Sequence, residues 1–163
     1  DAYADADWAI RRSTTGGTLQ LAGGSVLASS RRQDCVAGSS THAEVVATSS
    51  VAHDLLWASD YVVELGLPRS APPALHVDAA NAITVAHDYT SSNKTRHIQR
   101  RHLIVREFVQ AGRIQLEKVA SADNIADLLT KVLDRVPFER LRKLLLQLVR
   151  VGASAVGRKG RKT

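Results

Sequence analysis

The chain carries four acidic residues whose side chains could together hold metal ions: Asp5, Glu44, Asp78 and Asp127. Neighbouring carboxylates repel one another and raise one another's pKa, so such a cluster needs a positive partner. Hard divalent cations, which bind oxygen ligands, provide that partner. The four side chains lie close together only if the strands and helices that carry them are arranged to bring them there. Each residue can also be explained by a purely structural role.

The stretch ADADWA, residues 4–9, places two aspartates two positions apart in a predicted strand. Successive side chains of a strand point to opposite faces, so Asp5 and Asp7 share one face. Aspartate is a poor strand former, and a buried carboxylate is costly without a partner. Two interpretations stay open: an edge strand with its aspartates in solvent, or a buried carboxylate that is paired.

Glu44 lies at the start of the first predicted helix. In the sequence THAE, residues 41–44, it takes the place of the glutamate of a capping box, which bonds back to the cap residue. Glu44 is also in phase with the apolar stripe of the same helix, which includes Ala47 and Val51, so its side chain is expected to face the sheet. Capping is the simpler explanation for Glu44 taken alone.

Asp78 and Asp127 can each be explained by helix starts as well. Asp78 could cap a short helix that begins near Ala79, but the carboxyl end of a strand is also where open α/β sheets bind ligands. Asp127 lies in the early turns of a late helix, where negative charge is favourable, and Asp123 is the better N-cap candidate there. Each residue alone indicates little, but together the four predict a site for divalent cations.

The periodicity of the apolar residues predicts three strands, a long helix, a strand, helices, a strand and two final helices. Sequential strands favour an antiparallel meander, to which helix-linked strands can add in parallel. We expect an α/β fold with one mixed five-stranded sheet, three antiparallel strands and then two parallel ones, and helices on its faces. The predicted strands are 3–9, 18–22, 25–30, 74–77 and 113–119, and the predicted helices are 42–65, a short one from 79, 98–111, 123–133 and 137–149.

The composition predicts one domain over residues 1–150 and a basic, flexible tail over residues 151–163. The net charge of +6, from 22 Lys and Arg against 16 Asp and Glu, favours a polyanionic partner. No apolar run approaches the length of a membrane span, so no membrane partner is expected. The single cysteine, Cys35, suits a reducing compartment, and the absence of Met predicts a piece of a longer chain or a processed product.

Over residues 3–148 the chain resembles the ribonuclease H domain of copia-type LTR retrotransposon polyproteins. The resemblance implies a ribonuclease H-like fold, and it places the catalytic carboxylates on the four acidic residues named above. It also implies a reverse transcriptase domain in the same polyprotein as a partner. The stretches that carry it are, in order, YADADWA, RRSTTGG, SSRRQDCVAGSSTHAEVVA, LLWASDYVVELGLP, LHVDAANAI, NKTRHIQRRHLIVREFVQAGRIQLEKV and NIADLLTKVL.

The chemistry implied by the resemblance is hydrolysis of the RNA strand of RNA–DNA hybrids. Two Mg²⁺ ions, with Mn²⁺ as a substitute, would lie roughly 3.5–4 Å apart. Asp5 would bridge the two ions, Glu44 and Asp78 would bind one of them, and Asp127 would bind the other.

Recognition of the hybrid would rest on shape, backbone phosphates and 2′-hydroxyls rather than on base sequence. The expected phosphate contacts are Lys94, Arg96 and Arg12, although the basic stretch KTRHIQRR also fits a solvated face. His97 and His102 have no Cys or further His nearby, which argues against a zinc site.

The chain departs from the family pattern at three places. The first hairpin is shortened at Ile10, His42 replaces a glutamate, and Ala79 and Ala80 replace polar residues beside Asp78. The shortened hairpin, the changes beside Asp78 and the appended tail VGASAVGRKGRKT favour an alternative function. The alternative is a domesticated, non-catalytic domain that serves as a nucleic-acid-binding or assembly subunit of a larger complex. A second alternative is another nuclease of the superfamily, integrase-like or junction-resolving. In each case we expect an intracellular location, in a cytoplasmic particle or the nucleus.

Overall fold

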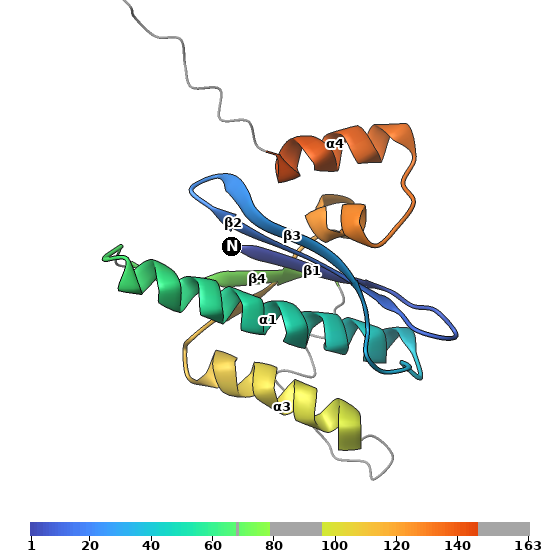
Figure 1. Ribbon diagram of the computed structural model, residues 1–163, viewed down its shortest axis with the longest axis horizontal. Coiled ribbons are helices and arrows are strands. Elements are labelled where there is room, and N and C mark those ends of the chain that lie inside the picture. The colour runs from blue at the N-terminus through green and yellow to red at the C-terminus, as the bar shows by residue number, and fades with distance from the viewer. Residues whose placement is uncertain (68, 79–95, 147–163) are drawn as a thin grey trace, which may run out of the picture.

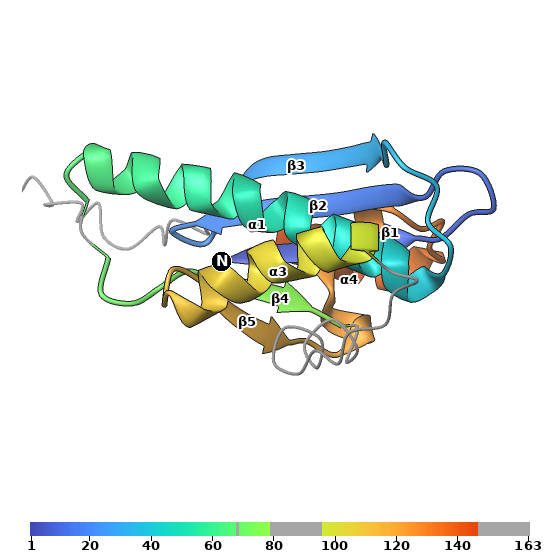
Figure 2. The ribbon, with the colours of Figure 1, turned by 90° about the horizontal axis from the view of Figure 1, so that it is seen from below.

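The computed structural model describes residues 1–67, 69–78 and 96–146, and for residues 96–100 and 102 the backbone alone. A five-stranded sheet runs through the centre in the order β3-β2-β1-β4-β5 (Figures 1 and 2). β1, β2 and β3 are antiparallel, and β4 and β5 add in parallel, which confirms the predicted mixed sheet. The strands are β1 (Ala2–Asp7), β2 (Thr14–Leu21), β3 (Gly24–Arg32), β4 (Ala74–Val77) and β5 (Gln115–Lys118).

Helices cover both faces of the sheet, as predicted. α1 (Ser40–Glu64) and α3 (Arg96–Gln110) lie on one face, and the 3₁₀ helix η2 (Ile125–Leu129) and α4 (Arg135–Leu145) lie on the other (Figure 1). Within the described ranges, no helix is both long enough and apolar enough to cross a bilayer.

The alternation of residues in β1 gives the sheet one apolar and one acidic face at this strand. Ala4 is buried in one cluster with Val51 of α1. A Cβ added at Gly17, the β2 neighbour of Ala4, would come within 2.5 Å of Val51 Cγ2, so the small residues let α1 lie close to the sheet. Because successive side chains alternate between faces, Asp5 and its β2 neighbour Gly16 face η2 instead.

The start of α1 differs from the prediction. Ser39 is the N-cap, and its side chain accepts a hydrogen bond from the backbone N–H of His42 at 3.1 Å. Thr41 therefore lies inside the helix, and the predicted capping box with Glu44 is wrong. At the other end, Gly66 adopts a left-handed conformation (φ 79°), which glycine accepts without strain, and it ends the helix as predicted.

The late helix predicted over residues 123–133 is wrong, because two short 3₁₀ helices, η1 (Ser121–Asp123) and η2, replace it. Asn124 separates them in an extended conformation and is the N-cap of η2, in place of the predicted Asp123. Its side chain accepts from Ala126 N at 3.2 Å and donates to the carbonyl of Ala4 at 3.0 Å, so an anchor to the sheet interrupts the helix. The helix predicted from residue 79, residues 147–149 and the predicted tail lie outside the described residues.

Candidate metal centre

Asp5 lies in the central strand of the sheet and is almost completely buried, with 1% of its surface exposed. Its Oδ2 accepts a hydrogen bond from Thr130 Oγ1, and its Oδ1 lies 3.2 Å from Lys131 Nζ. The solvent-exposed edge strand is therefore the wrong interpretation for Asp5, whereas Asp7 at the end of β1 is exposed. A hydroxyl and an ammonium offset the cost of burying the Asp5 carboxylate.

Asp78 reaches the same place because β1 and β4 are parallel neighbours. Ala4 pairs with Val77, so the next residues, Asp5 and Asp78, follow side by side. One oxygen of each of Asp5, Asp78 and Asp127 lies within 4.8 Å of the others. The structure thus brings together three of the four acidic residues that the sequence singled out.

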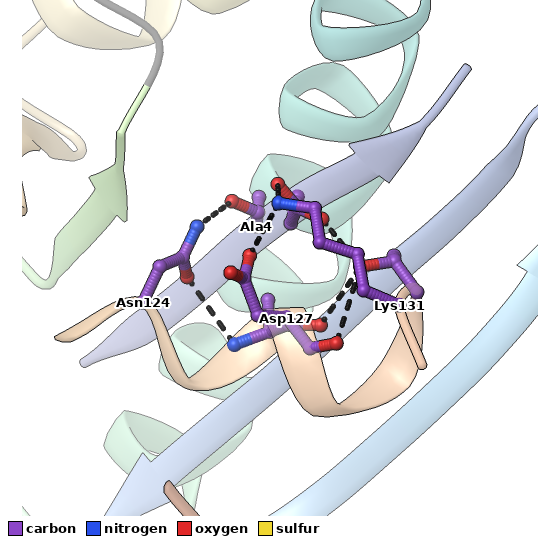
Figure 3. A network of polar contacts seen from close by, with 7 residues as sticks. Ala4, Asn124, Asp127 and Lys131 are labelled. Carbon is purple, nitrogen blue, oxygen red and sulfur yellow. Dashed lines mark hydrogen bonds and ion pairs between the residues drawn. The ribbon is translucent and has the colours of Figure 1, made fainter. Parts of the chain in front are cut away.

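Asp127 is placed by the close approach of η2 to β2. A Cβ at Gly16 would lie 2.6 Å from Thr130 Cγ2 and 2.8 Å from the carbonyl oxygen of Ala126, so a larger residue at this position would displace η2. Asn124 fixes the beginning of η2 through its hydrogen bond to a β1 carbonyl (Figure 3). These two contacts hold Asp127 beside the central strand.

Glu44 approaches the cluster from α1. Burial, followed by the charges of Asp5 and Asp78, raises the pKa of Glu44 from 4.5 to about 8, against the opposing effects of Lys131 and a backbone hydrogen bond with Ala6. The Glu44 carboxyl is therefore protonated at neutral pH without metal, and a nearby divalent cation would favour its ionised form. Glu44 lies close enough to sense the aspartates, although its oxygens are not part of the 4.8 Å cluster.

Lys131 is the residue of this site that the sequence interpretation missed. Its Nζ lies 2.8 Å from Asp127 Oδ1 (Figure 3). The same Nζ lies 3.2 Å from Asp5 Oδ1. Burial opposes the charge, but the hydrogen bond to Asp127 and the charges of both aspartates outweigh it and raise the pKa of Lys131. Burial also raises the pKa of Asp127, with Lys131 opposing the shift. The four-residue spacing of Asp127 and Lys131 is the signal that could have revealed the pair.

The predicted phosphate contacts are only partly within the described residues. Arg12 is exposed in the loop between β1 and β2, where it lines a shallow hollow with Arg11 and Arg32. The strand register places this hollow at the end of the sheet where β1 ends. Lys94 lies outside the described residues, and Arg96 is described only as the backbone at the start of α3. The side chains of His97 and His102 are likewise outside them.

The donor atoms fit a hard divalent cation. Three carboxylates from three separate elements converge, and neither Cys nor His belongs to this cluster. Oxygen atoms within 4.8 Å of one another can share an ion that binds each at about 2.0–2.6 Å. The raised pKa values of Glu44 and Asp127 reflect burial and mutual repulsion, which a divalent cation would relieve.

Comparison with known proteins identifies homologues among plant transposons. No protein-family model matches the chain. It is 33% identical over 147 residues to the retrovirus-related Pol polyprotein from transposon TNT 1-94 of Nicotiana tabacum, a match that covers 88% of this chain and 11% of the polyprotein. It is 32% identical over 146 residues to the retrovirus-related Pol polyprotein from transposon RE2 of Arabidopsis thaliana, a match that covers 87% of this chain and 10% of that polyprotein. The chain thus spans about a tenth of the length of these relatives.

Solved structures with the same fold are ribonuclease H domains. The N-terminal RNase H domain of Rv2228c from Mycobacterium tuberculosis has a TM-score of 0.53 at 15% identity and covers 87% of this chain and 94% of that one. RNase H1 from Halobacterium salinarum has a TM-score of 0.54 at 18% identity, covering 79% and 92%. LC11-RNase H1, isolated from compost, has a TM-score of 0.60 at 14% identity, covering 79% and 90%. The fold is therefore ribonuclease H-like, as expected.

Proposed function

We propose that this chain is the ribonuclease H domain of a copia-type retrotransposon polyprotein and that it hydrolyses the RNA strand of RNA–DNA hybrids with two Mg²⁺ ions. One observation carries the proposal: Asp5, Asp78 and Asp127 converge from three elements of a ribonuclease H-like fold. The homologous Pol polyproteins support the retrotransposon origin. The proposal includes a reverse transcriptase domain in the same polyprotein and action in a cytoplasmic particle or the nucleus.

Each carboxylate has a separate part in the proposed reaction. Asp5, in the central strand, would bind both ions, Glu44 and Asp78 would bind one, and Asp127 would bind the other. When bound, Mg²⁺ supplies an activated water and stabilises the leaving 3′ oxygen, and Mn²⁺ would serve as a substitute. Asn124 ties η2 to β1, so the relative position of Asp5 and Asp127 is built into the fold.

Binding of the hybrid would rest on its phosphate backbone. The arginines around the hollow, including Arg12, lie at the end of the sheet where β1, the strand that carries Asp5, ends. The net charge of +6 attracts a polyanion in general. Lys94 and Arg96 remain predicted contacts.

A cleavage assay tests the proposal. Purified chain is mixed with a hybrid labelled on the RNA strand, in Mg²⁺ and then in EDTA, with duplex DNA and branched DNA as competitors. We expect RNA cleavage that requires the ion and is lost in Asp5→Asn. Metal-dependent cleavage of duplex or branched DNA instead would support another nuclease of the superfamily.

The position of Lys131 favours the non-catalytic domain as the second candidate function. An ammonium between Asp5 and Asp127 partly neutralises the acidic cluster, so the domain can fold without metal and could act only in binding or assembly. Hybrid binding without any metal-dependent product, by protein that circular dichroism shows to be folded, would select this candidate and overturn the enzyme.

A further inference from the structure

Lys131 is built into the acidic cluster rather than lying beside it. It lies two residues after the end of η2, and its backbone N–H donates to the carbonyl of Asp127 at 2.9 Å. The side chain then turns back across η2 and places its Nζ within 3.2 Å of carboxylate oxygens from both Asp127 and Asp5. Thr130 holds the other oxygen of Asp5, so neighbouring residues contact both of its oxygens.

An ammonium at this place would exclude a metal ion from it. A Mg²⁺ ion shared by Asp5 and Asp127 would lie about 2.0–2.1 Å from an oxygen of each. The Nζ of Lys131 lies between the same two carboxylates, so both cations would occupy nearly the same volume. Two cations so close together also repel each other, so either the ammonium or the metal ion can be bound there, but not both.

We propose that Lys131 is a positioning residue whose ammonium holds Asp5 and Asp127 together in the metal-free protein and is displaced when an ion binds between them. This inference rests on the proposed function, because it concerns the ion that Asp127 would hold. Among the described contacts, those of the Lys131 ammonium are with Asp5 and Asp127 and not with Asp78, so an ion bound on the Asp78 side does not need the displacement. The two ions therefore bind with unequal affinity, and the ion at Asp127 is the weaker.

The exposure of Lys131 allows the displacement. Its side chain is 37% exposed, whereas those of Asp5 and Asp127 are 1% and 12% exposed. The ammonium can therefore rotate into solvent without opening the core, while Thr130 still holds the Asp5 carboxylate.

A titration with Mn²⁺ tests the inference without any measurement of hydrolysis. The electron paramagnetic resonance signal of unbound Mn²⁺ gives the number of bound ions and their dissociation constants for the wild type, Lys131→Met and Lys131→Gln. We expect both variants to bind the weaker ion about tenfold or more tightly, since a charge-assisted contact no longer competes. Lys143→Met, which removes an exposed lysine of α4, is the matched control and should bind as the wild type does.

A second measurement uses the wild type and does not depend on the folding of a variant. Nuclear magnetic resonance detects the Lys131 ammonium protons when hydrogen bonds protect them from exchange, and Mg²⁺ should abolish that protection. The inference would be overturned if the wild type and both variants bound the two ions with the same dissociation constants. It would also be overturned if the Lys131 ammonium protons stayed protected from exchange in saturating Mg²⁺. Either result would leave the proposed function intact. Failure of the wild type and the variants to bind any Mn²⁺ would overturn both.

Discussion

Glu44 should make the free energy of unfolding of the metal-free protein depend on pH, and the substitution Glu44→Gln should remove that dependence. Burial and the charges of Asp5 and Asp78 raise its pKa from 4.5 to about 8. Between these values the folded protein keeps a proton that the unfolded chain has released, so the free energy of unfolding falls as the pH rises through this window. The loss reaches about 4–5 kcal/mol above the upper value, since one pKa unit corresponds to about 1.4 kcal/mol.

Glu44→Gln keeps the shape of the side chain without the charge, so this pH dependence should disappear. The free energy of unfolding is measured by urea denaturation in EDTA from about pH 4.5 to pH 9. E44Q should match the wild type at the acidic end and exceed it by about 4–5 kcal/mol at the alkaline end. Glu64→Gln, at the exposed far end of α1, is the matched control and should follow the wild type. Parallel curves for wild type and E44Q would refute the reasoning.

Three further predictions concern the elements around the site. Gly16→Ala should lower the free energy of unfolding by about 1–3 kcal/mol and weaken Mn²⁺ binding, because its methyl group displaces η2. Gly38→Ala is the matched control: its added methyl group meets open space, so urea unfolding and Mn²⁺ titration should give the wild-type result. Asn124→Ala removes two buried hydrogen bonds to backbone groups and should cost about 1–3 kcal/mol in urea unfolding, so an unchanged midpoint would exclude the anchor. Arg12→Ala should weaken hybrid binding, measured by fluorescence anisotropy, and reduce its salt dependence by about one charge, whereas equal losses in Arg142→Ala on α4 would exclude a local contact.

The sheet and the meeting of Asp5 with Asp78 were predictable because topology alone determines them. Three consecutive strands form a meander, and a strand that returns through a helix adds in parallel, which brings the residue after β4 beside β1. Glu44 is in phase with the apolar stripe of α1, and this predicted that its side chain faces the sheet. The family motifs indicated Asp127, although the element that carries it is not the helix expected there.

Other features depend on tertiary contacts that a local pattern does not contain. Asn124 interrupts the late helix because its amide bonds a β1 carbonyl far away in the sequence. Ser39 and Thr41 both have side chains that can cap a helix, so the local sequence does not distinguish them. Ser39 caps α1 because the backbone is extended at Ser39 and already helical at Thr41. Lys131 was overlooked because a lysine in an apolar-basic stretch is usually solvated, and its partner Asp5 lies at the other end of the chain.

The central claim is that Asp5, Glu44, Asp78 and Asp127 hold a pair of divalent ions. A crystal structure of the chain with bound hybrid and Mn²⁺ measures this directly through the anomalous scattering of manganese. The account predicts two peaks roughly 3.5–4 Å apart, with Asp5 in contact with both and Asp127 in contact with one. The absence of manganese from these four carboxylates, with the Lys131 ammonium still seated between Asp5 and Asp127, would contradict it.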